Sequence, residues 1–121
     1  MLNDTIVSIS SGYGISAISV IRISGNLVNE IIKKIFKKEL KERYAHYLKL
    51  FNSEGKVIDD VIAIYYKAPR SYTGEDMLEI FSHGGIIIPK MIVREIIKIG
   101  ARQAEPGEFT KRAFLNGKMD L

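Results

Sequence analysis

Apolar residues recur with two different spacings along the 121-residue chain. Runs that alternate, or that are rich in β-branched residues, predict strands. These strands are expected at residues 5–9, 18–23, 44–51, 57–66 and 77–82. An Asn-Ser-Glu-Gly sequence at residues 52–55 supplies the residue types of a tight turn, so the third and fourth strands are predicted to form a hairpin.

Three other stretches place apolar residues at helical spacing. The first begins at residue 27, behind Asn26 as the expected N-cap. The second begins near Pro89 and is closed by Gly100, and the third begins at Pro106 and ends before Gly117.

Two connecting segments complete the pattern. The polar residues 68–76 are expected to form a surface loop, and residues 101–105 a short link to the third helix. The order of elements predicts an α+β fold with a mixed β-sheet and about three helices, rather than a regular βαβ array.

Length and composition predict one domain, residues 1–121, with an ordinary globular core. Apolar residues make up 46% of the chain and no apolar run is long enough to span a bilayer. There is no cysteine, and the first residues lack the basic and apolar regions of a secretory signal. These features favour a cytoplasmic protein without a membrane partner.

The formal net charge is +4, and five lysines gather between residues 33 and 41. They lie in and after the last turns of the first predicted helix, where cations complement the helix dipole. The alternative is a surface that contacts phosphates, which the mild net charge and the lack of interleaved aromatic residues support only weakly. The lysines in this cluster are Lys33, Lys34, Lys37, Lys38 and Lys41.

Several motifs of known chemistry fail on context. Residues 12–17 match the glycine pattern of a dinucleotide-binding loop, but a strand rather than a helix is predicted to follow. No phosphate-binding P-loop sequence and no serine-hydrolase nucleophile elbow occur. His46 and His83 are the only histidines, and no spacing groups carboxylates around them, so no metal site is expected.

Three charged residues are candidates for ligand binding. Arg22 and Glu79 each interrupt an apolar strand, which places them either on the solvent face of a half-buried sheet or in a pocket. Lys118 follows Gly117 and becomes a third candidate if the terminal segment folds back over the sheet.

Five segments together resemble the N-terminal domain of the MnmE/TrmE family of tRNA modification GTPases. They are Val-Ile-Arg-Ile-Ser-Gly at 20–25, Arg-Tyr-Ala-His-Tyr at 43–47, Ser-Tyr-Thr-Gly-Glu-Asp at 71–76, His-Gly-Gly at 83–85 and Pro-Gly-Glu-Phe-Thr-Lys-Arg-Ala-Phe at 106–114. The resemblance runs from Asp4 to Leu121. It implies a fold like the folate-binding domain of aminomethyltransferases.

The resemblance also implies a function. The domain is expected to bind 5-formyltetrahydrofolate or another tetrahydrofolate derivative, with Arg22, Glu79 and Lys118 as contacts, and to form a homodimer. The whole protein would modify the wobble uridine of tRNA with a flavin-dependent partner protein. Its GTP, magnesium and potassium would bind in a GTPase domain that this chain lacks, so the chain alone is expected to be inactive as a GTPase.

Two features qualify this expectation. The loop Ser10-Ser11-Gly12-Tyr13-Gly14 departs from the Pro-Pro-Gly-Arg-Gly-like sequence usual in the family, so ligand or subunit contacts of that loop are not expected to carry over. Residues 115–121 resemble the junction into the helical domain of the family. The alternative function is a basic tRNA-contacting module without a small-molecule ligand.

Overall fold

The structure is a computed structural model, and it describes residues 4–10 and 17–119. Within these residues a six-stranded sheet has the order β3-β4-β5-β2-β1-β6, antiparallel throughout except for the parallel β1–β6 pair. The predicted α+β fold with a mixed sheet is confirmed. The elements are β1 (Ile6–Ile9), β2 (Ile18–Ser24), α1 (Val28–Phe36), β3 (His46–Phe51), β4 (Val57–Tyr66), β5 (Met77–His83), α2 (Ile87–Ile99), β6 (Arg102–Gln103) and α3 (Glu108–Leu115).

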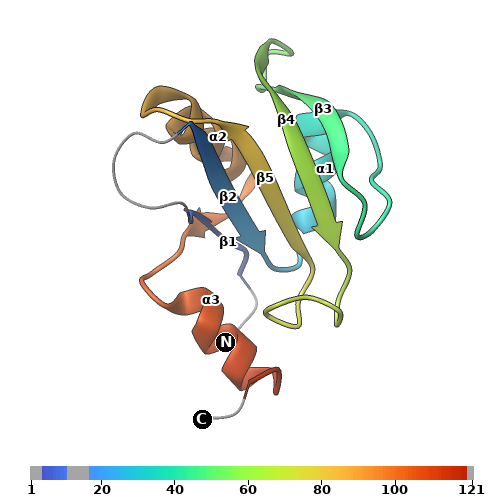
Figure 1. The fold of residues 1–121 in the computed structure, drawn as a ribbon, viewed down its shortest axis with the longest axis vertical. Coiled ribbons are helices and arrows are strands. Elements are labelled where there is room, and N and C mark those ends of the chain that lie inside the picture. Colours follow the sequence, from blue (N-terminus) through green and yellow to red (C-terminus); the bar gives the residue numbers. More distant parts are fainter. Residues whose placement is uncertain (1–3, 11–16, 120–121) are drawn as a thin grey trace.

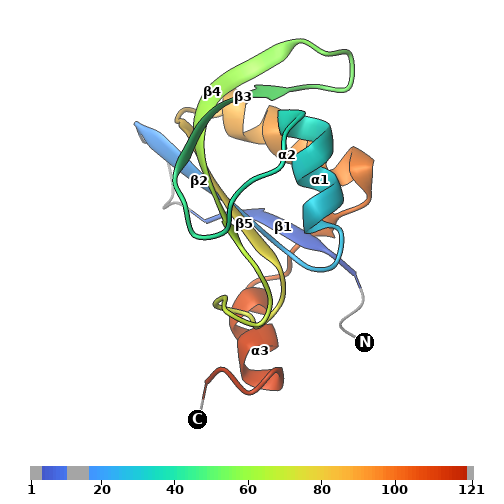
Figure 2. The same cartoon turned by 90° about the vertical axis from the view of Figure 1, so that its right-hand side faces the viewer.

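The helices cover one face of the sheet and leave the other open. Figures 1 and 2 show α1 and α2 on the same face, while α3 projects from one end of the molecule. In the described part of the chain no helix covers the opposite face, which we call the uncovered face. None of the helices in this part is long and apolar enough to cross a membrane.

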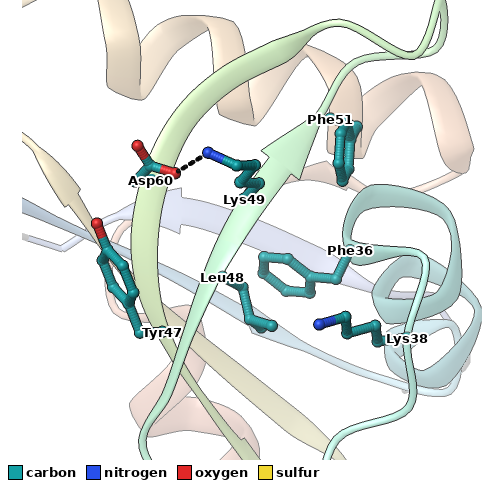
Figure 3. A pocket seen from close by; sticks show the side chains of 7 residues that line it. All are labelled: Phe36, Lys38, Tyr47, Leu48, Lys49, Phe51 and Asp60. Atoms are coloured by element: carbon teal, nitrogen blue, oxygen red, sulfur yellow. Dashed lines mark hydrogen bonds and ion pairs between the residues drawn. The ribbon is translucent and has the colours of Figure 1, made fainter.

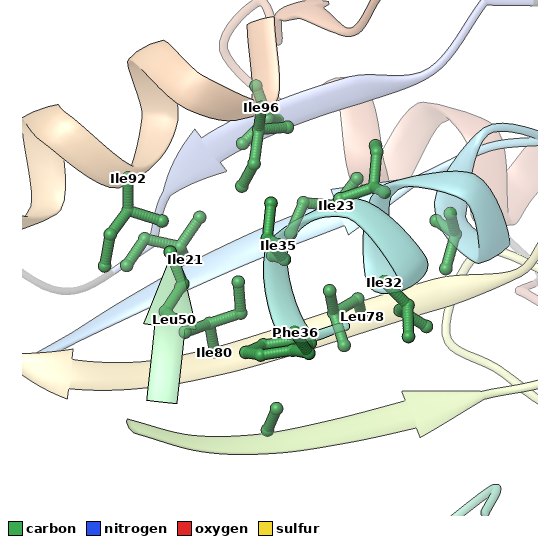
Figure 4. Packing of buried hydrophobic residues seen from close by; sticks show 14 of the residues in the cluster. Ile21, Ile23, Ile32, Ile35, Phe36, Leu50, Leu78, Ile80, Ile92 and Ile96 are labelled. Carbon is green, nitrogen blue, oxygen red and sulfur yellow. The ribbon is translucent and has the colours of Figure 1, made fainter. Parts of the chain in front are cut away.

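The core lies between the sheet and the two covering helices (Figure 4). Alternation sends Ile21 and Ile23 of β2 and Ile80 of β5 toward the helices, where all three are fully buried. Ile35 of α1 and Ile96 of α2 pack onto them from the helical side. The residues between these strand positions must therefore point to the uncovered face.

Three details differ from the sequence expectations. The prediction that Asn26 caps the first helix is wrong, because α1 starts at Val28 with Leu27 in the cap position and no side-chain cap. Thr5 performs this role from a distant segment, since its Oγ1 accepts the backbone N–H of Leu27 at 2.9 Å. Residues 68–76 do form a loop, but Thr73 within it is fully buried rather than at the surface. The link at residues 101–105 contains the short strand β6.

Candidate functional site

A carboxylate with two hydrogen-bond partners lies on the uncovered face. Nε of Arg22 donates to Oε2 of Glu79 at 2.8 Å, and the hydroxyl of Tyr66 donates to Oε1 at 3.0 Å. The Glu79 side chain is 16% exposed and that of Arg22 is 42% exposed. We call these three residues the Glu79 cluster.

The strand register brings the cluster together. Glu79 is paired with Arg22 across β2–β5, so the two side chains leave the sheet side by side. On the other side Glu79 is paired with Ile64 of β4, and Tyr66 lies two residues further along the same face. The guanidinium carbon of Arg43 lies 5.1 Å from the centre of the Tyr66 ring, a cation–π contact that flanks the cluster.

The cluster keeps unused hydrogen-bonding capacity. An ionised carboxylate has about four lone-pair sites, and only two hydrogen bonds to Glu79 come from described residues. Only Nε of Arg22 takes part in a hydrogen bond within the described part of the chain, which leaves both terminal nitrogens as donors. Burial, reinforced by the hydrogen bond to Glu79, raises the pKa of Tyr66, so its hydroxyl remains a donor at neutral pH.

Lys118 is positioned by the end of α3. The N–H of Gly117 donates to Phe114 O at 3.0 Å and the N–H of Lys118 to Ala113 O at 2.8 Å, with Gly117 at a φ of 75°. This is the Schellman pattern of a helix C-terminus, which uses glycine at the positive-φ position. The Lys118 ammonium then donates to Pro69 O at 3.1 Å in the β4–β5 loop.

A buried arginine holds α3 against that loop and the first strand. Nη1 of Arg112 donates to the backbone oxygen of Asp4 at 2.8 Å and to Glu75 Oε1 at 3.1 Å. Ser24 Oγ joins the same network, because it donates to Glu75 Oε1 at 2.7 Å and lies 2.7 Å from Thr73 Oγ1. The network fixes the β4–β5 loop, which carries the partner of Lys118, to the end of β2.

The structure thus brings two of the three predicted residues into direct contact. Arg22 and Glu79 form an ion pair, whereas Lys118 lies at the β4–β5 loop and makes its described hydrogen bond to Pro69. Sequence reasoning missed Tyr66. The available signal was its place in the alternation of β4, on the same face as Ile62 and Ile64.

The glycine pattern, the histidines and the question of a metal site were also raised by the sequence. Residues 12–16 of the glycine pattern at 12–17 lie outside the described residues. His83 pairs with a nearly buried carboxylate, since its Nδ1 lies 2.7 Å from Asp59 Oδ1 and its backbone N–H donates to Oδ2 of the same residue. Within residues 4–10 and 17–119, no three His, Asp or Glu side chains lie close enough together to hold a metal ion.

Comparison with known proteins assigns the chain to a family. A family model described as the GTP-binding protein TrmE N-terminus matches residues 5–118. The chain belongs to this family, which confirms the resemblance seen in the sequence.

Individual relatives support the same family assignment. A tRNA modification GTPase MnmE of Petrotoga mobilis is 56% identical over 122 residues, which cover 100% of this chain and 27% of that protein. The protein of the same description from Aquifex aeolicus is 52% identical over 122 residues, covering 99% of this chain and 27% of the relative. The chain therefore spans about a quarter of the length of these relatives.

Proposed function

We propose that this domain binds a tetrahydrofolate derivative, such as 5-formyltetrahydrofolate, with Glu79 as the anchor of the pterin ring. The observation that carries the proposal is the Glu79 carboxylate itself, held by Arg22 and Tyr66 on a sheet face that the described helices leave uncovered. A carboxylate in an apolar strand is costly to bury unless its partners compensate its charge. Arg22 and Tyr66 compensate Glu79 at one lone pair on each oxygen, and the remaining lone pairs are acceptors for a ligand.

The chemistry of a pterin matches this carboxylate. One edge of the ring presents an N–H beside an amino group, and a carboxylate can accept both in parallel. The apolar side chains of Ile64 and Phe81, which neighbour Glu79 on the uncovered face, offer a surface for the ring. Hydrogen bonds to a charged acceptor are stronger than those between neutral groups, which favours an oriented ligand.

The rest of a folate carries carbonyl and carboxylate groups, which suit the cations Arg22 and Lys118. The terminal nitrogens of Arg22 are donors without a partner among the described residues. Lys118 uses one of its three ammonium donors on Pro69, so two remain for a ligand at the β4–β5 loop.

We further propose that the uncovered face mediates homodimerisation. Ile18 is 60% exposed and Ile62 43% exposed, and the half-buried Val20 and Phe81 lie between them and the Glu79 cluster. A continuous apolar surface of this kind favours association, because a second copy removes it from water. The folate would then bind beside the subunit interface.

The wider context follows from the relatives, which are described as tRNA modification GTPase MnmE. For the whole protein we propose a role in modifying the wobble uridine of tRNA in the cytoplasm, with a flavin-dependent partner protein. GTP, magnesium and potassium would act in a region outside residues 1–121.

Calorimetric titration with two ligands tests the folate proposal. One is 5-formyltetrahydrofolate and the other is p-aminobenzoylglutamate, which has the folate tail without the pterin. If Glu79 anchors the pterin, the complete folate binds at least about tenfold more tightly, since that step corresponds to a single hydrogen bond to a charged group. Equal affinities, or no binding of the complete folate, would refute the proposal.

A further inference from the structure

A hollow of about 340 Å³ lies beside β3, the strand at one edge of the sheet. In Figure 3, Tyr47 and Lys49 project to one side of the strand, and Phe36, Lys38 and Phe51 lie on the other. Within the described residues β3 pairs only with β4, so its outer backbone edge also borders the hollow. The volume falls within the range of pockets that accept small molecules, and is ample for a single nucleobase. Leu48 and Asp60 complete the lining.

Positive charge is concentrated beside this hollow. Residues 33–49 contain seven of the 18 Lys and Arg residues of the chain but only two of its 14 acidic residues, so this segment carries a net charge of +5 and the rest of the chain −1. Lys37, Lys38 and Lys41 form no ion pair with any described residue, whereas Lys49 pairs with Asp60 at 3.1 Å. These cations are therefore available to a polyanion.

Exposed aromatic rings lie among these cations. Tyr47 is 76% exposed and Tyr44 is 55% exposed. The Lys41 ammonium lies 5.7 Å from the centre of the Tyr44 ring. Lys38, Tyr47, Lys49 and Phe51 line the hollow itself, and Lys41 and Tyr44 lie in the segment that joins α1 to β3. We call this the β3 edge surface, and it comprises Lys38, Lys41, Tyr44, Tyr47, Lys49 and Phe51.

We propose that the β3 edge surface binds a single-stranded segment of RNA. Lysines contact the phosphates, and unpaired bases stack on Tyr44 and Tyr47. Surfaces that bind single strands combine cations along the backbone with aromatic rings under the bases. This inference extends beyond the folate site, and it rests on the proposed tRNA context for the choice of RNA as the nucleic acid.

Two other occupants fit the surface less well. A peptide strand adding to the edge of β3 would meet Lys38 and Lys49, and lysines at a sheet edge oppose such pairing. A duplex would offer its phosphates, but its stacked bases are inaccessible to tyrosine rings. Exposed rings beside unpaired cations favour a strand whose bases are free.

Fluorescence anisotropy with a labelled twelve-nucleotide oligouridine, titrated at several KCl concentrations, tests the contribution of the cations. The double variant Lys38→Gln/Lys41→Gln is compared with Lys90→Gln/Lys111→Gln, which removes the same charge from exposed positions on α2 and α3. Each phosphate contact on a single strand contributes about 0.7 to the salt slope, so the first variant should lower the slope by about 1.4 and the second should not. Equal effects of the two double variants would overturn the proposal.

The contribution of the rings is tested at Tyr47. Replacing Tyr47 with Leu should weaken oligouridine binding about fivefold or more, while Tyr47→Phe, which keeps the ring, should retain affinity. The wild-type chain should bind the single strand more tightly than a duplex RNA of equal charge. If polyglutamate competes as well as RNA does, the surface recognises charge alone and the proposal is refuted. The same holds if Tyr47→Phe and Tyr47→Leu weaken binding equally.

The same variants separate this inference from the folate proposal. Lys38 and Lys41 do not belong to the Glu79 cluster, so 5-formyltetrahydrofolate should bind the Lys38→Gln/Lys41→Gln variant as it binds the wild type. Circular dichroism checks that each variant is folded. Loss of RNA binding with intact folate binding in the Lys38→Gln/Lys41→Gln variant supports the β3 edge surface, whereas an RNA affinity that survives both this variant and Tyr47→Leu refutes it.

Discussion

Nη1 of Arg112 in α3 lies 3.1 Å from Oε1 of Glu75 in the β4–β5 loop, and the Arg112 side chain is only 1% exposed. The same guanidinium contacts Asp4 and Glu108. One buried cation therefore joins the start of the described chain, the β4–β5 loop and the last helix. The position of Lys118, just beyond that helix, depends on this junction.

Replacing Arg112 with Met should destabilise the domain by about 3–5 kcal/mol, because three carboxylates lose a buried partner. The matched control is Arg70→Met at the exposed Arg70–Glu42 pair, where the loss should stay below about 1 kcal/mol. Urea unfolding of both variants measures the difference. Similar free energies of unfolding would show that the Arg112 junction contributes no more than a surface ion pair.

Gly74 tests how closely the end of α3 packs on the β4–β5 loop. A Cβ at this position would lie 3.1 Å from Asn116 Cβ and 3.3 Å from Lys118 Cγ. Gly55 has a similar φ, 81° against 84°, but a Cβ there would have no neighbour within 4 Å. Both Ala variants should lose about 1 kcal/mol from the positive φ. Only Gly74→Ala should also shift Lys118 and weaken folate binding, so equal folate affinities in the two variants would contradict the proposed contact.

The stability of the domain should decrease in acid through Glu108. Hydrogen bonds from Arg102, opposed by partial burial, hold the pKa of Glu108 at about 2, below its ordinary value of 4.5. Because the folded pKa is depressed, the stabilisation is complete above about pH 4.5 and is lost as the pH falls toward 2. We expect a contribution of about 1–2 kcal/mol, since Arg102 is partly solvated.

Unfolding free energies measured between pH 6 and pH 2 check this expectation. The wild type should lose stability over that window more steeply than Glu108→Gln, which has no carboxylate to protonate. Parallel curves for the two proteins would show that the Arg102–Glu108 pair does not govern the acid response.

Two isoleucines of similar exposure, one on the proposed dimer surface and one outside it, provide a test and a control for the dimer. Ile62 on the uncovered face is 43% exposed, and Ile97 on α2 is 41% exposed. Ile62→Lys should shift sedimentation equilibrium at micromolar concentration toward the monomer, because it places a charge in an apolar interface, while Ile97→Lys should leave the dimer intact. A wild type that is monomeric at high concentration would refute the interface.

The sequence predicted most of the fold because the strands and helices carry strong periodicity. Alternation in β2 and helical spacing in α1 each leave one consistent buried side. The cap of α1 and strand β6 were not predictable in this way. Thr5 reaches Leu27 only after the sheet forms, and β6 exists only through its pairing with β1, so both depend on tertiary contacts.

The candidate site was predictable only in part, for a similar reason. Arg22 and Glu79 were visible as charges in apolar strands, but their contact depends on the register between β2 and β5. Tyr66 gave no comparable signal, since an aromatic residue is ordinary in a strand. The buried Arg112 was also missed, because its partners Asp4 and Glu75 are distant in sequence.

Titration of 5-formyltetrahydrofolate against Glu79→Gln tests the central proposal most directly, with Asp60→Asn as a control that removes a carboxylate from the other end of the same sheet face. Glutamine keeps the size and one acceptor but loses the charged pair of oxygens, so affinity should fall about tenfold to a hundredfold while the fold is retained. Asp60→Asn should bind as the wild type does. If Glu79→Gln binds the folate with wild-type affinity, Glu79 is not the pterin anchor and the site must lie elsewhere.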